Sequence, residues 1–249
     1  MLRYILVLAT AGSVIFGATQ TRAQIVISEE NFVAVSQTNS TTGFFDSNSG
    51  TREVVFSAAD FSGTTGIVTD VDISISFAKS DDNSFVPQGG QLGTGTPFHS
   101  ETEFALTSPT GTSFTLISNG FGIEIVPADS FASFNPGFAS FNPGDFGSSF
   151  QGTILFDQDA AAPVNADPNN LTSGTFRPDD NTSNSLNIFN GESGLGTWSL
   201  FIEDNIAGDG LSFYEYTLTI TTEAQAVPEP TSAVVIGFAG SLLLMRRRR

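Results

Sequence analysis

The sequence contains no cysteine, one histidine and few charged residues, and each shortage narrows what the protein can be. Without cysteine there are no disulfide bonds and no thiol nucleophile, so the fold must be stabilised by its core or by bound ions. A mechanism that needs an imidazole base can use only His99. Charged residues make up 14% of the chain, where about 25% is usual. This composition is typical of short strands joined by polar turns.

Basic residues are scarce between the two ends of the chain. Of nine Lys and Arg residues, six lie in the end segments, and only Arg52, Lys79 and Arg177 lie between them. All 26 acidic residues fall between Glu29 and Glu229, so three basic residues face 26 acidic ones and the central part carries a formal charge of −23. A surface of that sign repels phosphate backbones. Nucleic acid is therefore excluded as a partner, whereas divalent cations or basic proteins fit.

Residues 1–23 have the pattern of a secretory signal peptide. Arg3 precedes an apolar stretch over residues 4–18, and the sequence Thr21-Arg22-Ala23 suits signal peptidase. Cleavage is predicted between Ala23 and Gln24, so we expect the protein to be exported. A retained membrane anchor is the alternative, although the apolar stretch is shorter than the ~20 residues that a spanning helix needs.

The C-terminal end combines three features in order. Pro228-Glu229-Pro230 is followed by a short apolar run over residues 233–245 and then by four arginines. The arginines are Arg246, Arg247, Arg248 and Arg249. This arrangement resembles the PEP-CTERM sorting signal of Gram-negative bacteria, which implies recognition by an exosortase and removal of the tail. The arginines would hold this transient inner-membrane anchor with its C-terminus in the cytoplasm. The mature protein is then expected in the cell envelope, on the cell surface or outside the cell.

Between the end segments, apolar and polar residues alternate with the period of two that is typical of strands. In residues 70–77 one face carries Val71, Ile73, Ile75 and Phe77, and the other carries Asp and Ser. The same alternation predicts further inward-facing sets: Phe104 and Leu106; Phe114 and Leu116; Ile154 and Phe156; Trp198, Leu200 and Ile202; and Tyr214, Tyr216, Leu218 and Ile220. No amphipathic helix is apparent. The pattern predicts an all-β fold, an antiparallel jelly-roll β-sandwich.

Two segments interrupt the alternation. Residues 80–102 are rich in Gly and Pro and are predicted to form a long surface loop. Residues 131–137 are repeated as residues 138–144, with the sequence FASFNPG, and two such copies are too few and too short for a solenoid. We interpret them as a duplicated loop whose phenylalanines pack on the sandwich or form a contact patch.

Residues 52–222 resemble the P domain (Homo B domain) that follows the subtilisin-like catalytic domain in proprotein convertases and many bacterial serine endopeptidases. The motif residues are Ser108, Pro109, Gly111 and Thr112 in a turn after a strand, and Gly196, Trp198 and Asp204 near the C-terminal strand. The resemblance implies a jelly roll of the galactose-binding-like type, which in relatives stabilises an adjacent protease. This chain departs from the family at Glu103-Phe104, where Asp-Leu is usual, and in its long segment 80–102.

No catalytic apparatus is recognisable in the sequence. A serine protease triad needs a histidine beside its nucleophile, but His99 lies in a Gly- and Pro-rich segment and no G-x-S-x-G elbow is present. We therefore predict no catalytic residue, and we take His99 for an ordinary surface residue, with a metal ligand as the alternative. A carboxylate glycosidase stays open, because it needs only two acids at the right separation.

Calcium is the cofactor that the oxygen-rich clusters of the sequence allow. The candidate ligands are Asp157 and Asp159, Asp179 and Asp180, and Glu203, Asp204 and Asp209. None of these clusters matches an EF-hand loop. The alternative is that these side chains form Asx turns between strands.

The predicted layout has five parts. They are a signal peptide (1–23), an N-terminal extension in strand or loop form (24–51), the P-domain-like unit (52–222), a linker with the PEP motif (223–232), and a short transmembrane segment with its Arg cluster (233–249). The predicted function is a non-catalytic surface or matrix interaction module whose partner is a separate subtilisin-like protease or a surface polysaccharide. A carbohydrate-binding jelly roll associated with exopolysaccharide and, more weakly, a carboxylate glycosidase are the alternatives.

Overall fold

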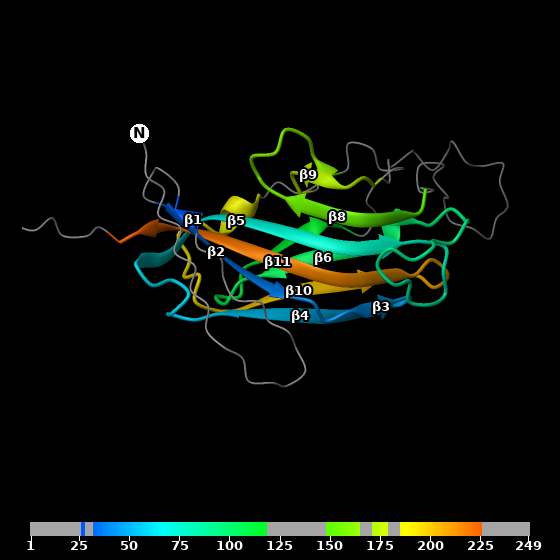
Figure 1. The fold of residues 1–249 in the computed structure, drawn as a ribbon, viewed down its shortest axis with the longest axis horizontal. Coiled ribbons are helices and arrows are strands. Elements are labelled where there is room, and N and C mark those ends of the chain that lie inside the picture. The colour runs from blue at the N-terminus through cyan, green and yellow to red at the C-terminus, as the bar shows by residue number, and fades with distance from the viewer. Residues whose placement is uncertain (1–25, 28–31, 119–147, 165–170, 179–184, 226–249) are drawn as a thin grey trace, which may run out of the picture.

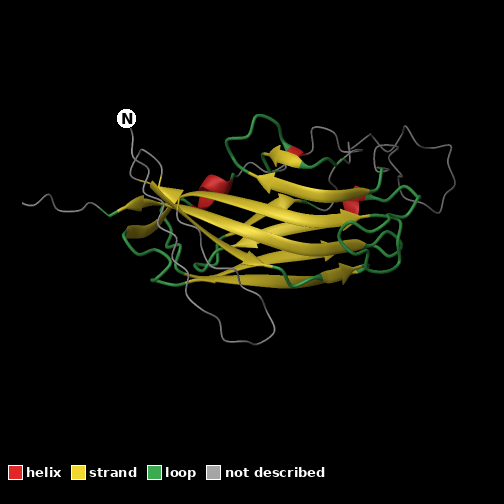
Figure 2. Ribbon diagram, viewed as in Figure 1, coloured by secondary structure: helices red, strands yellow, loops and turns green. Residues whose placement is uncertain are grey.

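The computed structural model of the chain describes residues 26–27, 32–118, 148–164, 171–178 and 185–225. They form two β-sheets packed face to face (Figures 1 and 2). Within these residues, helix is confined to short 3₁₀ turns such as η1 (His99–Glu101) and η4 (Leu186–Phe189). The predicted all-β sandwich is confirmed.

The first sheet has the strand order β1-β2-β11-β5-β8-β9, and β3 also pairs with β11. Its strands are β1 (Val26–Ile27), β2 (Phe32–Asn39), β3 (Gly43–Phe45), β5 (Thr64–Lys79), β8 (Phe150–Phe156), β9 (Gly174–Phe176) and β11 (Leu211–Ala224). The second sheet has the order β4-β10-β6-β7. Its strands are β4 (Asn48–Phe56), β6 (Thr102–Thr107), β7 (Ser113–Ile117) and β10 (Gly196–Asp204). The pairs are antiparallel, except that β9 runs parallel to β8.

The N-terminal extension is part of the sandwich and not a separate arm. Strand β2 pairs with β11, the last strand, along residues 32–39, and β3 pairs with the start of β11. Val33 and Val35 of β2 thereby join the hydrophobic core. Next, β4 enters the second sheet, β5 returns to the first and β6 enters the second again. The two sheets are thus linked repeatedly along the chain.

Alternation along the strands builds the core between the sheets. Val71, Ile73, Ile75 and Phe77 of β5 are all buried, as predicted. The ring of Phe77 packs edge to face against the ring of Phe104 in the opposite sheet, and the ring centroids are 5.0 Å apart. The inward sets predicted for β6, β7, β8 and β10 are also buried. The period-two pattern therefore identifies the buried face because both sheets have one face against the core.

The last strand departs from its predicted pattern at Tyr214. A β-bulge shifts the register of β11 between Phe213 and Glu215, so Phe213 and Tyr216 face the core and Tyr214 does not share their face. Instead, the Tyr214 hydroxyl accepts a hydrogen bond from Gln151 Nε2 at 2.6 Å, and its ring meets that of Phe85. Phe85 comes from the segment 80–98, which therefore covers part of the outer face of the first sheet.

Strands β6 and β7 form an antiparallel hairpin, and its turn packs against another loop. The Ser108 amide donates to the Thr112 carbonyl at 2.8 Å, and Gly111 adopts a φ of 91°. The Thr110 hydroxyl donates to the Glu192 carboxylate at 2.7 Å, and the Thr112 hydroxyl also donates to it. The turn also lies against Gly196, where an added Cβ would be 2.7 Å from Pro109 Cβ. The turn residues of the P-domain motif and Gly196 are therefore brought together.

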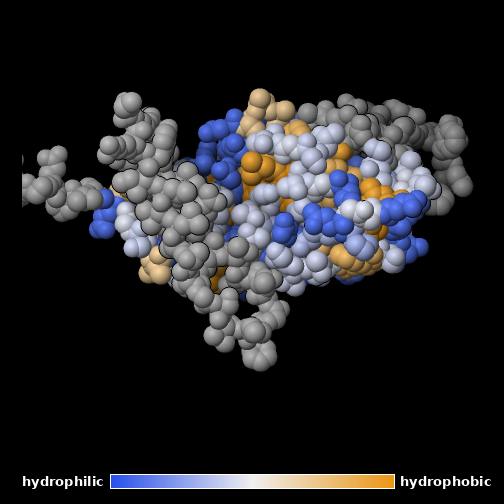
Figure 3. All heavy atoms as spheres, in the orientation of Figure 1, coloured by the Kyte–Doolittle hydropathy of each residue, from blue (hydrophilic) through white to orange (hydrophobic). Residues whose placement is uncertain are grey.

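The described surface mixes polar and apolar side chains. On the face in view in Figure 3, apolar residues (orange) occur in small groups among polar ones. The exposed large apolar side chains come from different elements and loops: Val55, Ile67, Phe85, Ile188, Leu195 and Ile206. Within the described ranges, no helix is long and apolar enough to cross a membrane. The predicted signal peptide, the duplicated FASFNPG segment and the sorting tail lie outside the described residues.

The contact between Gly196 and Pro109 predicts a selective loss of stability. Gly196 has a φ of 123°, and Gly208 has a similar φ of 128° but open space where a Cβ would lie. Gly208→Ala should cost about 1 kcal/mol of unfolding free energy from backbone strain alone. Gly196→Ala should cost a further 1–3 kcal/mol, on the order of a typical overpacking penalty. Equal losses for the two variants in denaturant titrations would contradict this packing.

Candidate functional site

A buried group of charged residues lies at one end of the sandwich, around Lys79. Lys79 is the last residue of β5 and continues the inward face of Ile73, Ile75 and Phe77, and its side chain is fully buried. Asp204 ends β10 in the same way, after Trp198, Leu200 and Ile202. The alternation that builds the core therefore also carries these two charges inward at the strand ends. Sequence analysis missed Lys79, although one further step of the same alternation would have found it.

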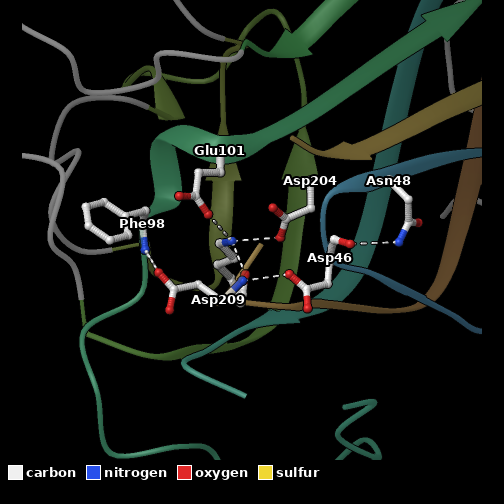
Figure 4. A network of polar contacts seen from close by, with 8 residues as sticks. Asp46, Asn48, Phe98, Glu101, Asp204 and Asp209 are labelled. Atoms are coloured by element: carbon white, nitrogen blue, oxygen red, sulfur yellow. Dashed lines mark hydrogen bonds and ion pairs between the residues drawn. The ribbon is translucent and has the colours of Figure 1, made fainter. Parts of the chain in front are cut away.

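The Lys79 ammonium is surrounded by oxygen atoms from three segments (Figure 4). Nζ donates to Asp204 Oδ2 at 2.7 Å and to Glu101 Oε2 at 3.1 Å. It also donates to the backbone carbonyl of Asp209. Glu101 belongs to η1 and is buried, like Asp204. One cation is thus shared by two carboxylates and a carbonyl; we call this group of Lys79, Glu101, Asp204 and Asp209 the Lys79 network.

Backbone hydrogen bonds hold the segments of the Lys79 network together. The Phe98 amide donates to Asp209 Oδ2 at 3.0 Å, and the Asn205 amide donates to the Glu101 carbonyl at 3.2 Å. In the same loop, the Gly208 amide donates to Asp46 Oδ1 at 2.8 Å. These contacts join the end of segment 80–98 to the loop between β10 and β11 and to the β3–β4 turn (Figure 4). The network is therefore fixed from several sides.

Burial dominates the electrostatics of the Lys79 network. It raises the pKa of Glu101 to about 7, against the opposing charge of Lys79 and its hydrogen bond. It raises the pKa of Asp204 to about 6, again against the effect of Lys79. Both carboxyl groups can therefore hold or release a proton near neutral pH. Asp204 Oδ1 and Thr102 Oγ1 are buried without a hydrogen-bond partner among the described residues.

His99 is not the surface residue that the sequence suggested. It begins η1, two residues before Glu101, and its exposure is only 1%. The pKa of His99 is lowered to about 4, chiefly by burial and also by the charge of Lys79, whereas a hydrogen bond with the Ser148 backbone acts in the opposite direction. The prediction failed because the Gly- and Pro-rich segment 80–102 is a surface loop only in its middle; its two ends enter the core.

The residues predicted to bind calcium do not lie together in the structure. Asp204 and Asp209 are both in the Lys79 network, with Lys79 between them. Asp159 is exposed and Asp157 is half-buried, and the Asp159 amide donates to Asp157 Oδ1 at 2.7 Å, the local geometry of an Asx turn. Glu203 is half-buried on β10, and Asp179 and Asp180 lie outside the described residues. In the described parts of the chain, no group of three or more His, Asp or Glu is arranged to hold a metal ion.

Asp157 and Asp159 have two acidic neighbours that the sequence analysis did not link to them. Ile73 of β5 pairs with Phe156 of β8, which brings Asp72 beside Asp157 at the next position. The pKa of Asp72 is raised to about 7, chiefly by burial and also by the charges of Asp70, Asp157 and Asp159. The pKa of Asp70 is raised for the same main reason. This acidic surface group therefore concentrates negative charge on the outer face of the first sheet.

The remaining motif residues have structural roles. Trp198 is fully buried, and its Nε1 donates to the Gly194 carbonyl at 3.0 Å. Burial raises the pKa of Glu192, but hydrogen bonds from the hydroxyls of Ser108, Thr112 and Thr110 outweigh this effect and lower it overall. The ionised Glu192 therefore stabilises the 108–112 turn. Asp204 stands apart from this turn, in the Lys79 network.

Comparisons with known proteins give little further information. No family profile matches the chain, and no curated protein matches it. Among solved structures, the chain is similar to one in the crystal structure of the Aeromonas sobria serine protease and chaperone (ORF2) complex, with 14% identity and a TM-score of 0.35. The alignment covers 78% of this chain and 27% of that one, so this chain spans about a quarter of its length. The resemblance to the P domain accordingly rests on the motif residues.

The raised pKa of Asp72 predicts that its charge destabilises the fold. The folded state holds this proton up to about pH 7, whereas the unfolded chain releases it near pH 4. The protonated form of Asp72 therefore stabilises the fold at low pH, and this contribution is lost as the pH rises from about 4 to about 7. Asp72→Asn should stabilise the protein at pH 8 by about 1–2 kcal/mol, after allowance for solvent screening, and have little effect at pH 4.

Denaturant titrations at the two pH values measure this difference. Glu223→Gln removes an exposed carboxylate at the end of β11 and serves as the matched control. A pH-independent effect of Asp72→Asn, or an equal pH-dependent effect of Glu223→Gln, would contradict the assignment.

Proposed function

We propose that the protein is a non-catalytic, exported interaction module of the cell surface or surface matrix, built on a P-domain-like β-sandwich. The burial of His99, the one histidine of the chain, is the observation that carries this proposal. A serine protease needs an imidazole that can reach both its nucleophile and the substrate. An imidazole enclosed beside the Lys79 network does not meet that requirement.

The resemblance to the P domain supports a partner in proteolysis. In the family, the domain stabilises a subtilisin-like protease, and serine-type endopeptidase activity belongs to that protease. This chain would act as the accessory of a separate enzyme, and the long segment 80–98 over the outer sheet face gives it a surface unlike that of its relatives. Function does not follow from fold, so the partner has to be identified by experiment.

The proposed route to the surface rests on the two end segments. Signal peptidase would cleave between Ala23 and Gln24. An exosortase would recognise Pro228-Glu229-Pro230 and release the chain from its transient inner-membrane anchor. The four terminal arginines support this orientation by the positive-inside rule.

The burial of the Trp and Tyr side chains disfavours the carbohydrate-binding alternative. Sugars stack on exposed rings of these types, but Trp198 and Tyr216 are fully buried and Tyr214 is 4% exposed. The remaining tyrosine, Tyr4, lies in the predicted signal peptide. A glycosidase would need accessible carboxylates, for which the acidic surface group around Asp72 is a better candidate than the Lys79 network. Release of reducing sugar from host polysaccharide tests that alternative directly.

Calcium binding at the acidic surface group remains a prediction. Asp157 and Asp159 carry exposed or half-exposed oxygens, and Asp70 and Asp72 add charge beside them. Millimolar Ca²⁺ should raise the melting temperature, and Asp157→Asn should remove most of that rise because one ligand charge is lost. A melting temperature indifferent to both calcium and chelator would contradict it.

In-cell crosslinking in the native host tests the proposed function. We expect the mature protein to be recovered with a subtilisin-like protease, because the P-domain resemblance carries that partner. Glu229→Ala, which alters the sorting tripeptide, should reduce the crosslink, since the protein would stay in the inner membrane. Recovery of polysaccharide or of further copies of the chain would instead mean that the fold serves the surface matrix without a protease.

A further inference from the structure

The Lys79 network places a nucleophile, an acyl carbon and a proton carrier in one enclosed site. We propose that Lys79 and Asp204 become joined by an intramolecular isopeptide bond between Nζ and Cγ, with Glu101 as the residue that carries the protons. The product is an amide that links strand β5 of the first sheet to strand β10 of the second. This modification is independent of the partner proposed above.

The geometry already holds the reacting groups together. Nζ is 2.7 Å from Asp204 Oδ2, and Cγ is one covalent bond beyond that oxygen. Both side chains are fully buried, and they lie at the ends of strands in opposite sheets. Positioning of this kind converts a slow reaction between two free groups into an intramolecular one. The Asp209 carbonyl also accepts from Nζ and restricts where the amine can point.

The surroundings of Lys79 favour neutral groups over ions. Its neighbours in the flanking strands are Phe150 and Leu211, both buried, and Phe77 precedes it on the same face. Two opposite charges in such surroundings lose hydration, so a neutral amide is favoured over the ion pair more than it would be in water. The pKa values of Glu101 and Asp204 are raised, to about 7 and about 6, so either carboxylate can take up a proton near neutral pH.

Glu101 lies where a proton carrier is needed. Its Oε2 is 3.1 Å from Nζ, on the same ammonium that contacts Asp204. It is slightly less buried and farther from Nζ than Asp204, and so we assign it as the carrier and Asp204 as the acyl group. η1 and the Asn205 amide fix its backbone.

The reaction balances without a cofactor or oxidant. Glu101 takes a proton from the Nζ ammonium, and the free amine attacks Cγ of Asp204. The Nζ–Cγ bond forms and one Cγ–O bond breaks. Of the three protons on Nζ, one stays on the amide and two leave with the Asp204 oxygen as water. Glu101 passes both protons on and ends as the carboxylate that it was at the start.

The mass of the folded wild-type chain decides whether the bond exists. We expect the purified, denatured protein to be lighter than its processed sequence by one water molecule. Trypsin should also fail to cut after Lys79, because an amide nitrogen carries no charge. An unmodified mass with normal cleavage after Lys79 would overturn the proposal.

Formation of a succinimide also removes one water molecule, so it must be distinguished from formation of the isopeptide bond. Asp209 precedes Gly210, a pair prone to cyclise, and the cyclic product has the same mass. A succinimide leaves Lys79 cleavable and reopens in mild base, whereas an isopeptide bond does neither. Loss of water with normal cleavage after Lys79 would therefore also overturn the proposal. Fragment masses of the linked peptides should place the bond at Asp204; a bond at Glu101 would overturn the assignment.

Matched variants test the roles of the three residues. Glu101→Gln keeps the size of the side chain but cannot carry the protons, so its mass should remain unmodified. Lys79→Met removes the nucleophile and should give the same result. Asp70→Asn changes a carboxyl of the acidic surface group and should leave the water loss unchanged. A Glu101→Gln protein that still loses water would refute the role of Glu101. If that variant does not fold, the wild-type mass and digest still decide on the bond.

Discussion

The charge of Lys79 inside the sandwich is the constraint on which this end of the structure depends. A buried ammonium without counter-charges costs several kcal/mol, on the order of the stability of a whole domain. The chain meets this cost with Asp204 at the end of β10, Glu101 on η1 and the Asp209 carbonyl in the loop before β11. Those three positions in turn fix the ends of the 80–98 segment. One buried cation thus organises segments that are far apart in the sequence.

The same constraint explains how a strongly acidic chain distributes its charge. With three basic residues against 26 acidic ones in the central part, few carboxylates can find a cation. Of the carboxylates in the described ranges, Lys79 contacts the two that are most deeply buried. Arg52 bonds to backbone carbonyls instead, beside the rings of Phe45 and Phe213. Other acids must stay near solvent, and some of them gather around Asp72, whose pKa is raised by its burial and by the charges of its acidic neighbours. The acidic surface group is therefore a consequence of the charge imbalance.

Alternation in the sequence predicts the faces of the strands because each sheet has one face against the core. That reasoning identifies the buried residues of β5 and β10. It fails at Tyr214, because a bulge turns this side chain to the other face of the sheet. The prediction for His99 fails because the Gly- and Pro-rich composition of segment 80–102 indicates a surface loop, whereas only the middle of the segment is one. The Lys79 network could not be fully predicted, because residues 79, 101 and 204 meet only through the pairing of distant strands. Charged residues at the ends of inward-facing patterns were the available signal.

The absence of cysteine gives the Lys79 network its larger significance. A sandwich without disulfides has only its core and its ion pairs to resist unfolding. A covalent link between residues 125 positions apart would restrict the unfolded chain as a disulfide does. In the loop-entropy account it would raise the free energy of unfolding by about 5 kcal/mol. Unlike a disulfide, an amide does not depend on the redox state of the surroundings. It would also turn a costly buried ion pair into a neutral bond. This combination is the physical argument for placing Lys79 and Asp204 at the point where the two sheets meet.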